Sequence, residues 1–248
     1  MHRFRFLLRA SCTVALPLIV FMGGLPGQTH AQDYPTKPVR LIVSFAPGGP
    51  VDVIARLLAQ KLAERTGQAF IVENRAGAGG NIAAKLVSGT AGDGYTLLVT
   101  SSAMAVNQTL YKDPGYDALK DFAPIALAAT SPNILIANVA VPATNLREFI
   151  RDHKGRPVAF GSAGVGSTPH LSGDHILRVL AGLDAVHVPF QGASPALAAV
   201  LAGEPPIASI ALPPAVAQIK AGKLKGLAVT SLKRIDALPH VPTVAESG

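Results

Sequence analysis

Stretches typical of β-strands alternate with stretches of helical periodicity along most of this sequence. Val39–Phe45 is apolar and rich in β-branched residues. After a Gly/Pro loop, the apolar residues of 51–62 recur at helical spacing up to Gly67. The alternation continues with expected strands at Phe70–Val72, Tyr95–Thr100, Val158–Gly161, Val186–Phe190, Ile207–Leu212 and Leu224–Thr230, and with expected helices at Gly79–Val87, Pro169–Ala181, Pro195–Ala202 and Pro214–Ala221. This order predicts an α/β fold with mostly parallel sheets.

The first 31 residues are typical of a secretory signal peptide. Arg3, Arg5 and Arg9 precede the apolar stretch Val14–Leu25, and small and polar residues lead to a predicted cut after Ala31. The alternative is a membrane anchor, but the apolar stretch is shorter than the roughly 20 residues that span a bilayer. The only cysteine, Cys12, lies in this segment, so the mature chain has none, in keeping with an oxidising compartment.

Composition excludes several classes of protein. The chain is 49% hydrophobic and 15% charged, which excludes intrinsic disorder. It has no tryptophan, nine phenylalanines and four tyrosines, too few for an aromatic platform that stacks nucleic-acid bases. The formal net charge is +7, but three of these charges lie in the predicted signal peptide and the rest are scattered. Binding to nucleic acid or to a membrane surface is therefore not expected.

The stretch Phe122–Leu146 contains no charged residue. A membrane helix would explain this, but Pro124, Pro132 and Pro142 interrupt it. We expect two extended segments joined by a turn, as in a connection between two lobes.

Three glycine-containing loops each follow an expected strand and open an expected helix: residues 45–52, 161–169 and 191–195. Free backbone N–H groups and the helix dipole favour an anion at such places. In the second loop, Thr168 is expected as the N-cap and Pro169 as the first helical residue. Ordinary strand-to-helix turns remain the alternative for each loop, whereas three loops at equivalent strand ends favour a shared binding cleft.

The sequence gives little support for nucleotide or metal binding. No loop continues as Gly-Lys-Ser/Thr, so a P-loop is absent. The glycine-rich stretches 77–82 and 164–169 both lack the third glycine of the dinucleotide-binding fingerprint. The histidines show no metal-ligand spacing, since His170 and His175 are five residues apart. Asp52 and Arg56 are expected to form a stabilising i,i+4 pair.

The best enzyme hypothesis is a serine hydrolase. Ser194 lies in a sequence similar to a nucleophile elbow, with His187 and either Asp174 or Asp184 as conceivable partners. However, the next residue is Pro195, which has no N–H to donate to an oxyanion. An N-cap role explains Ser194 better.

The motifs together resemble those of the Bug receptors, the periplasmic solute-binding proteins of tripartite tricarboxylate transporters. Phe45-Ala46-Pro47-Gly48-Gly49 followed by Asp52, Ala55 and Arg56 is similar to the opening motif of the family. The resemblance covers the chain from Tyr34 onward, with further matches at residues 72–82, 93–98, 160–164, 221–231 and 238–246.

This resemblance implies a two-lobed type II periplasmic binding protein fold of the α/β class. The implied organisation is a signal peptide at 1–31, lobe 1 at 32–125, lobe 2 at 126–225, and a return to lobe 1 at 226–248. The implied role is a periplasmic receptor, not an enzyme, that closes as a monomer on a small organic carboxylate and delivers it to membrane transporter subunits. No cofactor and no metal are implied.

The resemblance also assigns site residues. The first-lobe wall would be formed by Phe45, Ala46, Pro47, Gly48 and Gly49, with Ser101, Ser102 and Ala103 beside it. The carboxylate would be held by Ser162, Ala163, Gly164, Gly166, Ser167 and Thr168, with Gln191 on the facing loop.

Two departures from the family pattern affect these expectations. Glu204–Ser209 replaces a segment that is usually Gly-x-Val/Ile-Asp. Family members also continue beyond the position of Gly248, so we expect a truncated product with an incomplete lobe 1. The alternatives are the same fold used in sensing, or a chain left non-functional by truncation. No position in the sequence fixes the length of the ligand.

Overall fold

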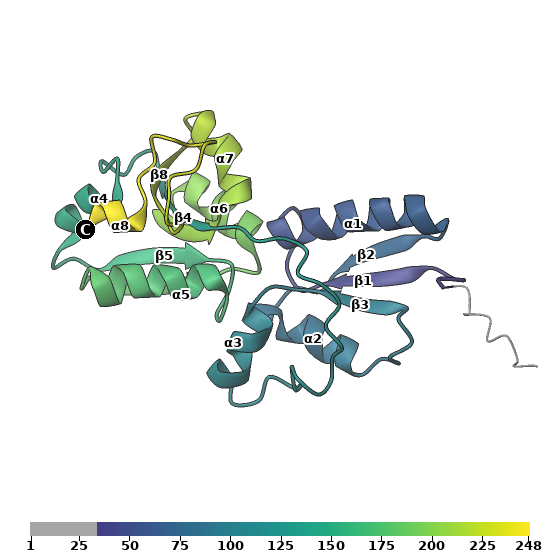
Figure 1. Cartoon of the computed structure of the whole chain (residues 1–248). Coiled ribbons are helices and arrows are strands. Elements are labelled where there is room, and N and C mark those ends of the chain that lie inside the picture. The colour runs from purple at the N-terminus through teal and green to yellow at the C-terminus, as the bar shows by residue number, and fades with distance from the viewer. Residues whose placement is uncertain (1–33) are drawn as a thin grey trace, which may run out of the picture. The chain divides into compact units, whose positions relative to one another are not determined.

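The computed structural model describes residues 34–248, so the predicted signal peptide lies outside the described residues. Strands and helices alternate along the chain as the sequence predicts, and they form two separate sheets (Figure 1).

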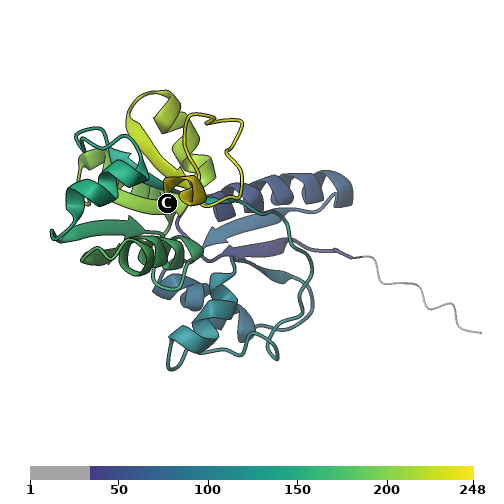
Figure 2. The same ribbon diagram turned by 60° about the vertical axis from the view of Figure 1, so that its left-hand side comes forward.

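The first sheet has three parallel strands in the order β2-β1-β3. These are β1 (Val39–Val43), β2 (Phe70–Asn74) and β3 (Thr96–Val99), connected by α1 (Pro50–Thr66), the single turn η1 (Ala78–Gly80) and α2 (Asn81–Ser88), and followed by α3 (Ala103–Leu110). Side chains of a strand alternate between faces, so Leu41 packs with Ala59 of α1, and Ile42 packs with Ala83 of α2. Helices therefore cover both faces (Figures 1 and 2).

The second sheet has five strands in the order β6-β5-β7-β4-β8. Its elements are β4 (Asn133–Asn138), α4 (Leu146–His153), β5 (Val158–Ser162), α5 (Thr168–Asp174), the π-helical turn η2 (His175–Leu180), β6 (Ala185–Pro189), α6 (Ala193–Ala202), β7 (Ile207–Ala211), α7 (Leu212–Lys220), β8 (Leu224–Val229) and α8 (Val244–Ser247). β5, β6 and β7 are parallel, as predicted, whereas β4 runs antiparallel to β7 and β8.

Two apolar clusters hold this second sheet. On one face, Leu135 and Phe160 pack with Phe149 of α4 and Leu177 of η2. On the other face, side chains of β4 and β7 pack with α6 and α7; these include Ile134, Ile136, Val200, Ile210 and Leu212. The twofold alternation along β4 thus supplies both clusters.

Within the uncharged stretch Phe122–Leu146, one segment is a β-strand and the segment before it has no regular structure, where two extended segments joined by a turn are expected from the sequence. Residues 122–132 have no regular structure, β4 follows, and α4 begins at Leu146. Within residues 34–248, no helix has the length and apolar character required to cross a membrane.

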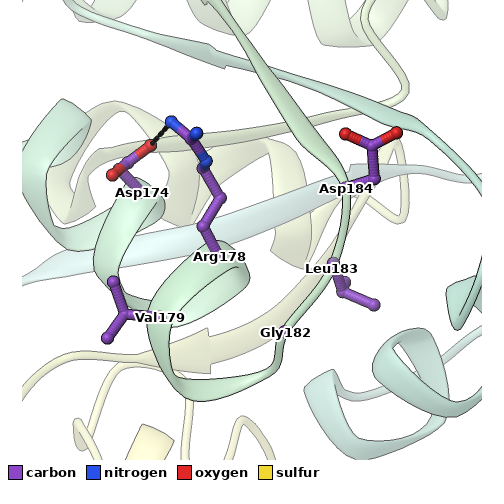
Figure 3. A pocket seen from close by; sticks show the side chains of 6 residues that line it. All are labelled: Asp174, Arg178, Val179, Gly182, Leu183 and Asp184. Atoms are coloured by element: carbon purple, nitrogen blue, oxygen red, sulfur yellow. Dashed lines mark hydrogen bonds and ion pairs between the residues drawn. The ribbon is translucent and has the colours of Figure 1, made fainter.

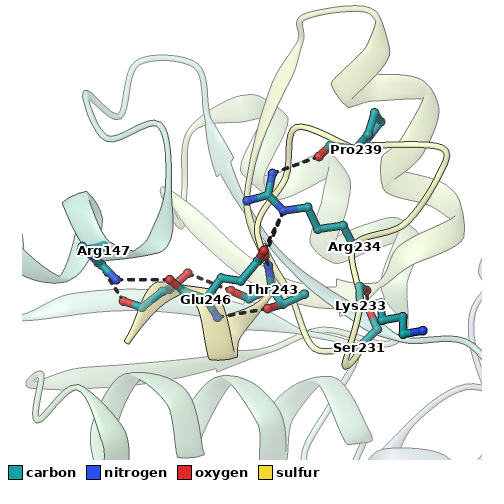
Figure 4. A network of polar contacts seen from close by, with 8 residues as sticks. Arg147, Ser231, Lys233, Arg234, Pro239, Thr243 and Glu246 are labelled. Carbon is teal, nitrogen blue, oxygen red and sulfur yellow. Dashed lines mark hydrogen bonds and ion pairs between the residues drawn. The ribbon is translucent and has the colours of Figure 1, made fainter.

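Residues 226–248 lie against the second sheet, instead of returning to the first as expected. β8 pairs with β4, and the capping box of α8 closes between Thr243 and Glu246. Glu246 also accepts a hydrogen bond from Arg234 at 3.0 Å, and Arg147 donates to the carbonyl of Ser247 at 3.1 Å (Figure 4). The remaining lobe boundaries stay predictions.

Candidate ligand-binding site

The three predicted loops lie where β1, β5 and β6 end. We call residues 45–49 the first loop, residues 163–168 the second loop and residues 190–192 the third loop. The N–H of Ala46 donates to the carbonyl of Gln191 at 2.9 Å, which joins the first loop to the third. The second loop lies against the third loop and against Gly79: a Cβ atom added to Gly164 would lie 3.1 Å from the carbonyl oxygen of Phe190, and one added to Gly79 would lie 2.2 Å from the carbonyl oxygen of Val165.

Asp52 organises the first loop. Its side chain is 3% exposed and accepts hydrogen bonds from the Gly48 N–H, the Arg56 guanidinium and the Asn74 amide, each at 2.9 Å. Burial alone would raise the pKa of the Asp52 carboxyl, but these hydrogen bonds and the charge of Arg56 hold it below its ordinary value. The predicted Asp52–Arg56 pair is present, and it places a negative charge at the start of α1. The Gly48 N–H is therefore occupied within the protein.

We expect Asp52→Ala to lower the free energy of unfolding by about 1–3 kcal/mol, because it removes the acceptor that three donors share. Arg56→Ala is the matched control. Its side chain is 55% exposed, so its loss is expected to cost less than about 1 kcal/mol. Urea unfolding of both variants checks this. Equal losses would show that the ion pair, and not the anchoring of the loop, accounts for the effect.

The second loop has hydrogen bonds that leave particular N–H groups free. The Gly164 N–H donates to Ser162 Oγ at 3.2 Å, and the Ser167 N–H donates to the Gly164 carbonyl at 3.2 Å. Among the described residues, the N–H groups of Ala163, Val165 and Thr168 have no partner. Thr168 is exposed and is the first residue of α5, so its N–H and hydroxyl lie at the positive end of the helix dipole.

The cap of α5 differs from the prediction. Ser167, not Thr168, is the N-cap: its hydroxyl accepts from the His170 N–H at 3.3 Å and donates to the Gly164 carbonyl at 2.6 Å. Thr168 is therefore the first residue of α5 and not its N-cap. Its side chain faces solvent at the helix start, where an anion is stabilised.

Ser162 lies beneath the second loop and not on its surface. Ser162 has no solvent-exposed surface, and its hydroxyl oxygen lies 2.6 Å from His187 Nε2. The ring of His187 lies 4.1 Å from that of His170, centroid to centroid. Burial, and secondarily the neighbouring His170, lower the pKa of His187 to about 4, and burial also lowers the pKa of His170. Both imidazoles are therefore neutral at pH 7.

The other predicted residues differ in accessibility. Phe45, Ala103, Ala163, Gly164, Gly166 and Ser167 are buried, whereas Ser102 and Gln191 are exposed. The Ser101 hydroxyl accepts a hydrogen bond from the Ala103 N–H at 3.2 Å.

The sequence analysis does not identify Gly79 and Asn107 as site residues. Asn107 bonds to the Gly79 carbonyl and Asn81, and its buried Oδ1 has no hydrogen-bond partner among the described residues.

The geometry does not favour the hydrolase hypothesis. His187, the proposed base for Ser194, contacts Ser162 instead. Ser194 is not an N-cap either, since Gly192 occupies that position and Ser194 lies in the first turn of α6. The Ser162–His187 pair resembles a catalytic dyad, but the hydroxyl is buried.

Two open depressions are found in the described part of the chain, and one of them reaches the second loop at Thr168. One is lined by Asp174, Arg178, Val179 and residues 182–184, where Arg178 pairs with Asp174 at 3.1 Å (Figure 3). A second, lined partly by Thr168, Leu171 and Ser172, extends along α5. Within residues 34–248 no group of three or more metal-ligating side chains is found.

Comparison with known structures identifies the class of protein. "Structure of a periplasmic transporter" matches with a TM-score of 0.83 and 40% identity, over 87% of this chain and 73% of that one. BugD, a periplasmic binding protein, matches with a TM-score of 0.80 and 34% identity, over 87% and 72%. The predicted fold class is thus confirmed: the neighbours are solute-binding proteins and not enzymes.

Sequence comparison gives the family. The model of the tripartite tricarboxylate transporter family receptor matches residues 54–248. BugT of Bordetella pertussis is 35% identical over 93% of this chain and 72% of its own length. The chain belongs to this receptor family, as the sequence motifs indicated.

The chain is shorter than its relatives. A protein of the tcbD-tcbE intergenic region of Pseudomonas sp. (strain P51) is 38% identical over 86% of this chain, which spans 64% of that relative. The chain spans 72% of the length of BugT.

Proposed function

We propose that this chain is a periplasmic receptor that binds a small carboxylate at the second loop and delivers it to the membrane subunits of a tripartite transporter. The free N–H groups of Ala163, Val165 and Thr168 carry this proposal, because they provide unpaired donors beside the start of α5. Such donors favour an anion without an arginine clamp. The Thr168 hydroxyl adds a further donor.

Structural neighbours support the ligand class. An R. palustris protein solved with adipate matches with a TM-score of 0.83 and 37% identity. MatC from Rhodopseudomonas palustris, solved with bound malate, matches with a TM-score of 0.78 and 33% identity. We therefore propose a dicarboxylate for this chain. The first and third loops would form the opposite wall, and cleavage after Ala31 would release a monomer into the periplasm.

The test is a thermal-shift and calorimetry screen of the purified chain against a carboxylate panel of malate, succinate, adipate, glutarate and benzoate. A ligand at 100 times its Kd stabilises the folded state by about 2.7 kcal/mol. In a domain of this size, that raises Tm by roughly 5–10 °C.

The methyl esters of the same acids are the control, dimethyl for the four dicarboxylates and monomethyl for benzoate, since they keep the carbon skeleton and lose the charge. Saturable binding of at least one of the four dicarboxylates, with no binding of its ester, is the expected result. The absence of binding across the panel, binding of benzoate alone, or equal binding of acid and ester would contradict a dicarboxylate site.

A further inference from the structure

Two histidines lie beneath the second loop. His170 comes from α5 and His187 from β6, 17 residues later in the chain. Their ring centroids are 4.1 Å apart at an interplanar angle of 33°, and the ring of Phe160 from β5 lies 5.1 Å from that of His187. Helix and sheet thus bring the two imidazoles together in a partly buried layer.

His170 accepts a hydrogen bond from the second loop, and His187 forms one with Ser162 at the base of this loop. The Gly166 N–H donates to His170 Nδ1 at 3.2 Å. His187 Nε2 lies 2.6 Å from Ser162 Oγ, which itself accepts from the Gly164 N–H at 3.2 Å. His170 therefore fixes the Gly166 amide directly, and His187 fixes the Gly164 amide through the Ser162 hydroxyl. These two amides alternate along the chain with the free amides of Ala163 and Val165.

The charges that face this pair are few. Asp174, one turn after His170 on α5, acts on both imidazoles and favours their protonated forms. Its carboxylate pairs with Arg178 of η2 at 3.1 Å. Burial lowers the pKa of both imidazoles, His170 further lowers that of His187, and together these effects outweigh Asp174, so the pair is neutral at pH 7.

We propose that His170 and His187 are positioning residues whose neutral imidazoles hold the second loop in the shape that binds the carboxylate. This inference rests on the proposed function. Protonation would turn Nδ1 of His170 into a donor that faces the Gly166 N–H, and the hydrogen bond would be lost. The pair therefore makes carboxylate affinity sensitive to acid through the shape of the loop.

Isosteric variants separate this role from packing. In His170→Asn, the amide oxygen can replace Nδ1 as acceptor; in His187→Gln, the amide oxygen can replace Nε2. His170→Leu and His187→Leu fill similar space without an acceptor. With the panel acid that binds the wild type best, we expect the leucine variants to lose about tenfold in affinity, and the amide variants to stay within about threefold of the wild type. Equal affinities of the leucine and amide variants would overturn the proposal.

The pH profile gives a second readout. The ligand carboxylates titrate equally in every variant, and His170→Asn keeps their contribution and that of His187 while it removes that of His170. Between pH 7 and pH 4, we expect the wild type to lose affinity more steeply than His170→Asn. If affinity falls equally with pH in the two proteins, or falls less in the wild type, protonation of His170 does not weaken binding through the second loop.

A third readout needs no ligand, so it separates failure of this inference from failure of the proposed function. Amide hydrogen exchange at Gly166, followed by NMR at pH 7, is expected to be slow in the wild type and in His170→Asn and at least tenfold faster in His170→Leu. If no panel acid binds but this pattern holds, the proposed ligand is wrong and the positioning role stands. Equal exchange in all three proteins would overturn the positioning role.

Discussion

Thr168→Asp is expected to reduce carboxylate affinity about 100-fold while Tm stays unchanged or rises. Thr168 is exposed at the first position of α5, and its N–H is one of the free donors of the second loop. An aspartate there would place a fixed negative charge beside a carboxylate bound at the second loop. For two negative charges assumed to lie about 5 Å apart at an effective dielectric constant of about 20, the repulsion is about 3 kcal/mol, or roughly 100-fold in Kd.

The same substitution favours the helix, because an acidic residue in the first turn interacts with the dipole by about 0.3–1 kcal/mol. Stability and affinity therefore move in opposite directions, which separates a charge effect from damage to the fold. Thr168→Asn is the matched control: it has nearly the same shape without the charge, and we expect a loss of affinity below tenfold. Calorimetric titration and thermal melts measure both quantities. Similar affinities of the Asp and Asn variants would place the carboxylate away from α5.

The repeating pattern of the fold was predictable because it depends on local signals. The apolar periodicity after Pro50 and the glycine at position 67 define α1, and Gly67 ends it with a φ of +72°. The antiparallel direction of β4 was not predictable, since it depends on which distant strands pair with residues 133–138. The same holds for residues 226–248, whose place beside β4 is determined by long-range pairing.

The site was predicted as a set of loops but not as a set of contacts. Pro169 favoured Thr168 as the cap by the usual preference for proline at the first helical position. The structure instead selects Ser167, because its hydroxyl can also reach the Gly164 carbonyl. His170 and His187 showed no motif, since 17 residues separate them and only the packing of α5 on β5 and β6 brings them together. A neutral histidine used as a hydrogen-bond acceptor has no sequence signature.

Gly79→Ala is expected to lower carboxylate affinity at least tenfold through a residue that is not expected to touch the ligand. Gly79 has a φ of +63°, and an added Cβ would lie 2.2 Å from the Val165 carbonyl oxygen and 3.3 Å from the Asn107 amide nitrogen. The obstacle at Val165 is backbone, so no side-chain rotation can relieve it. The second loop must move, and the free N–H of Val165 moves with it.

Gly67→Ala is the control for backbone strain. Gly67 has a similar φ of +72°, but no atom lies within 4 Å of an added Cβ. Both variants are expected to lose about 1 kcal/mol of stability from the left-handed conformation. Only Gly79→Ala is expected to lose affinity as well, because moving one charge-assisted donor away from a carboxylate costs about 1.5–3 kcal/mol, or roughly 10- to 100-fold. Thermal melts and calorimetric titrations of the two variants measure these effects. If Gly79→Ala binds the ligand as tightly as Gly67→Ala, the contact between Gly79 and Val165 does not determine the position of the second loop.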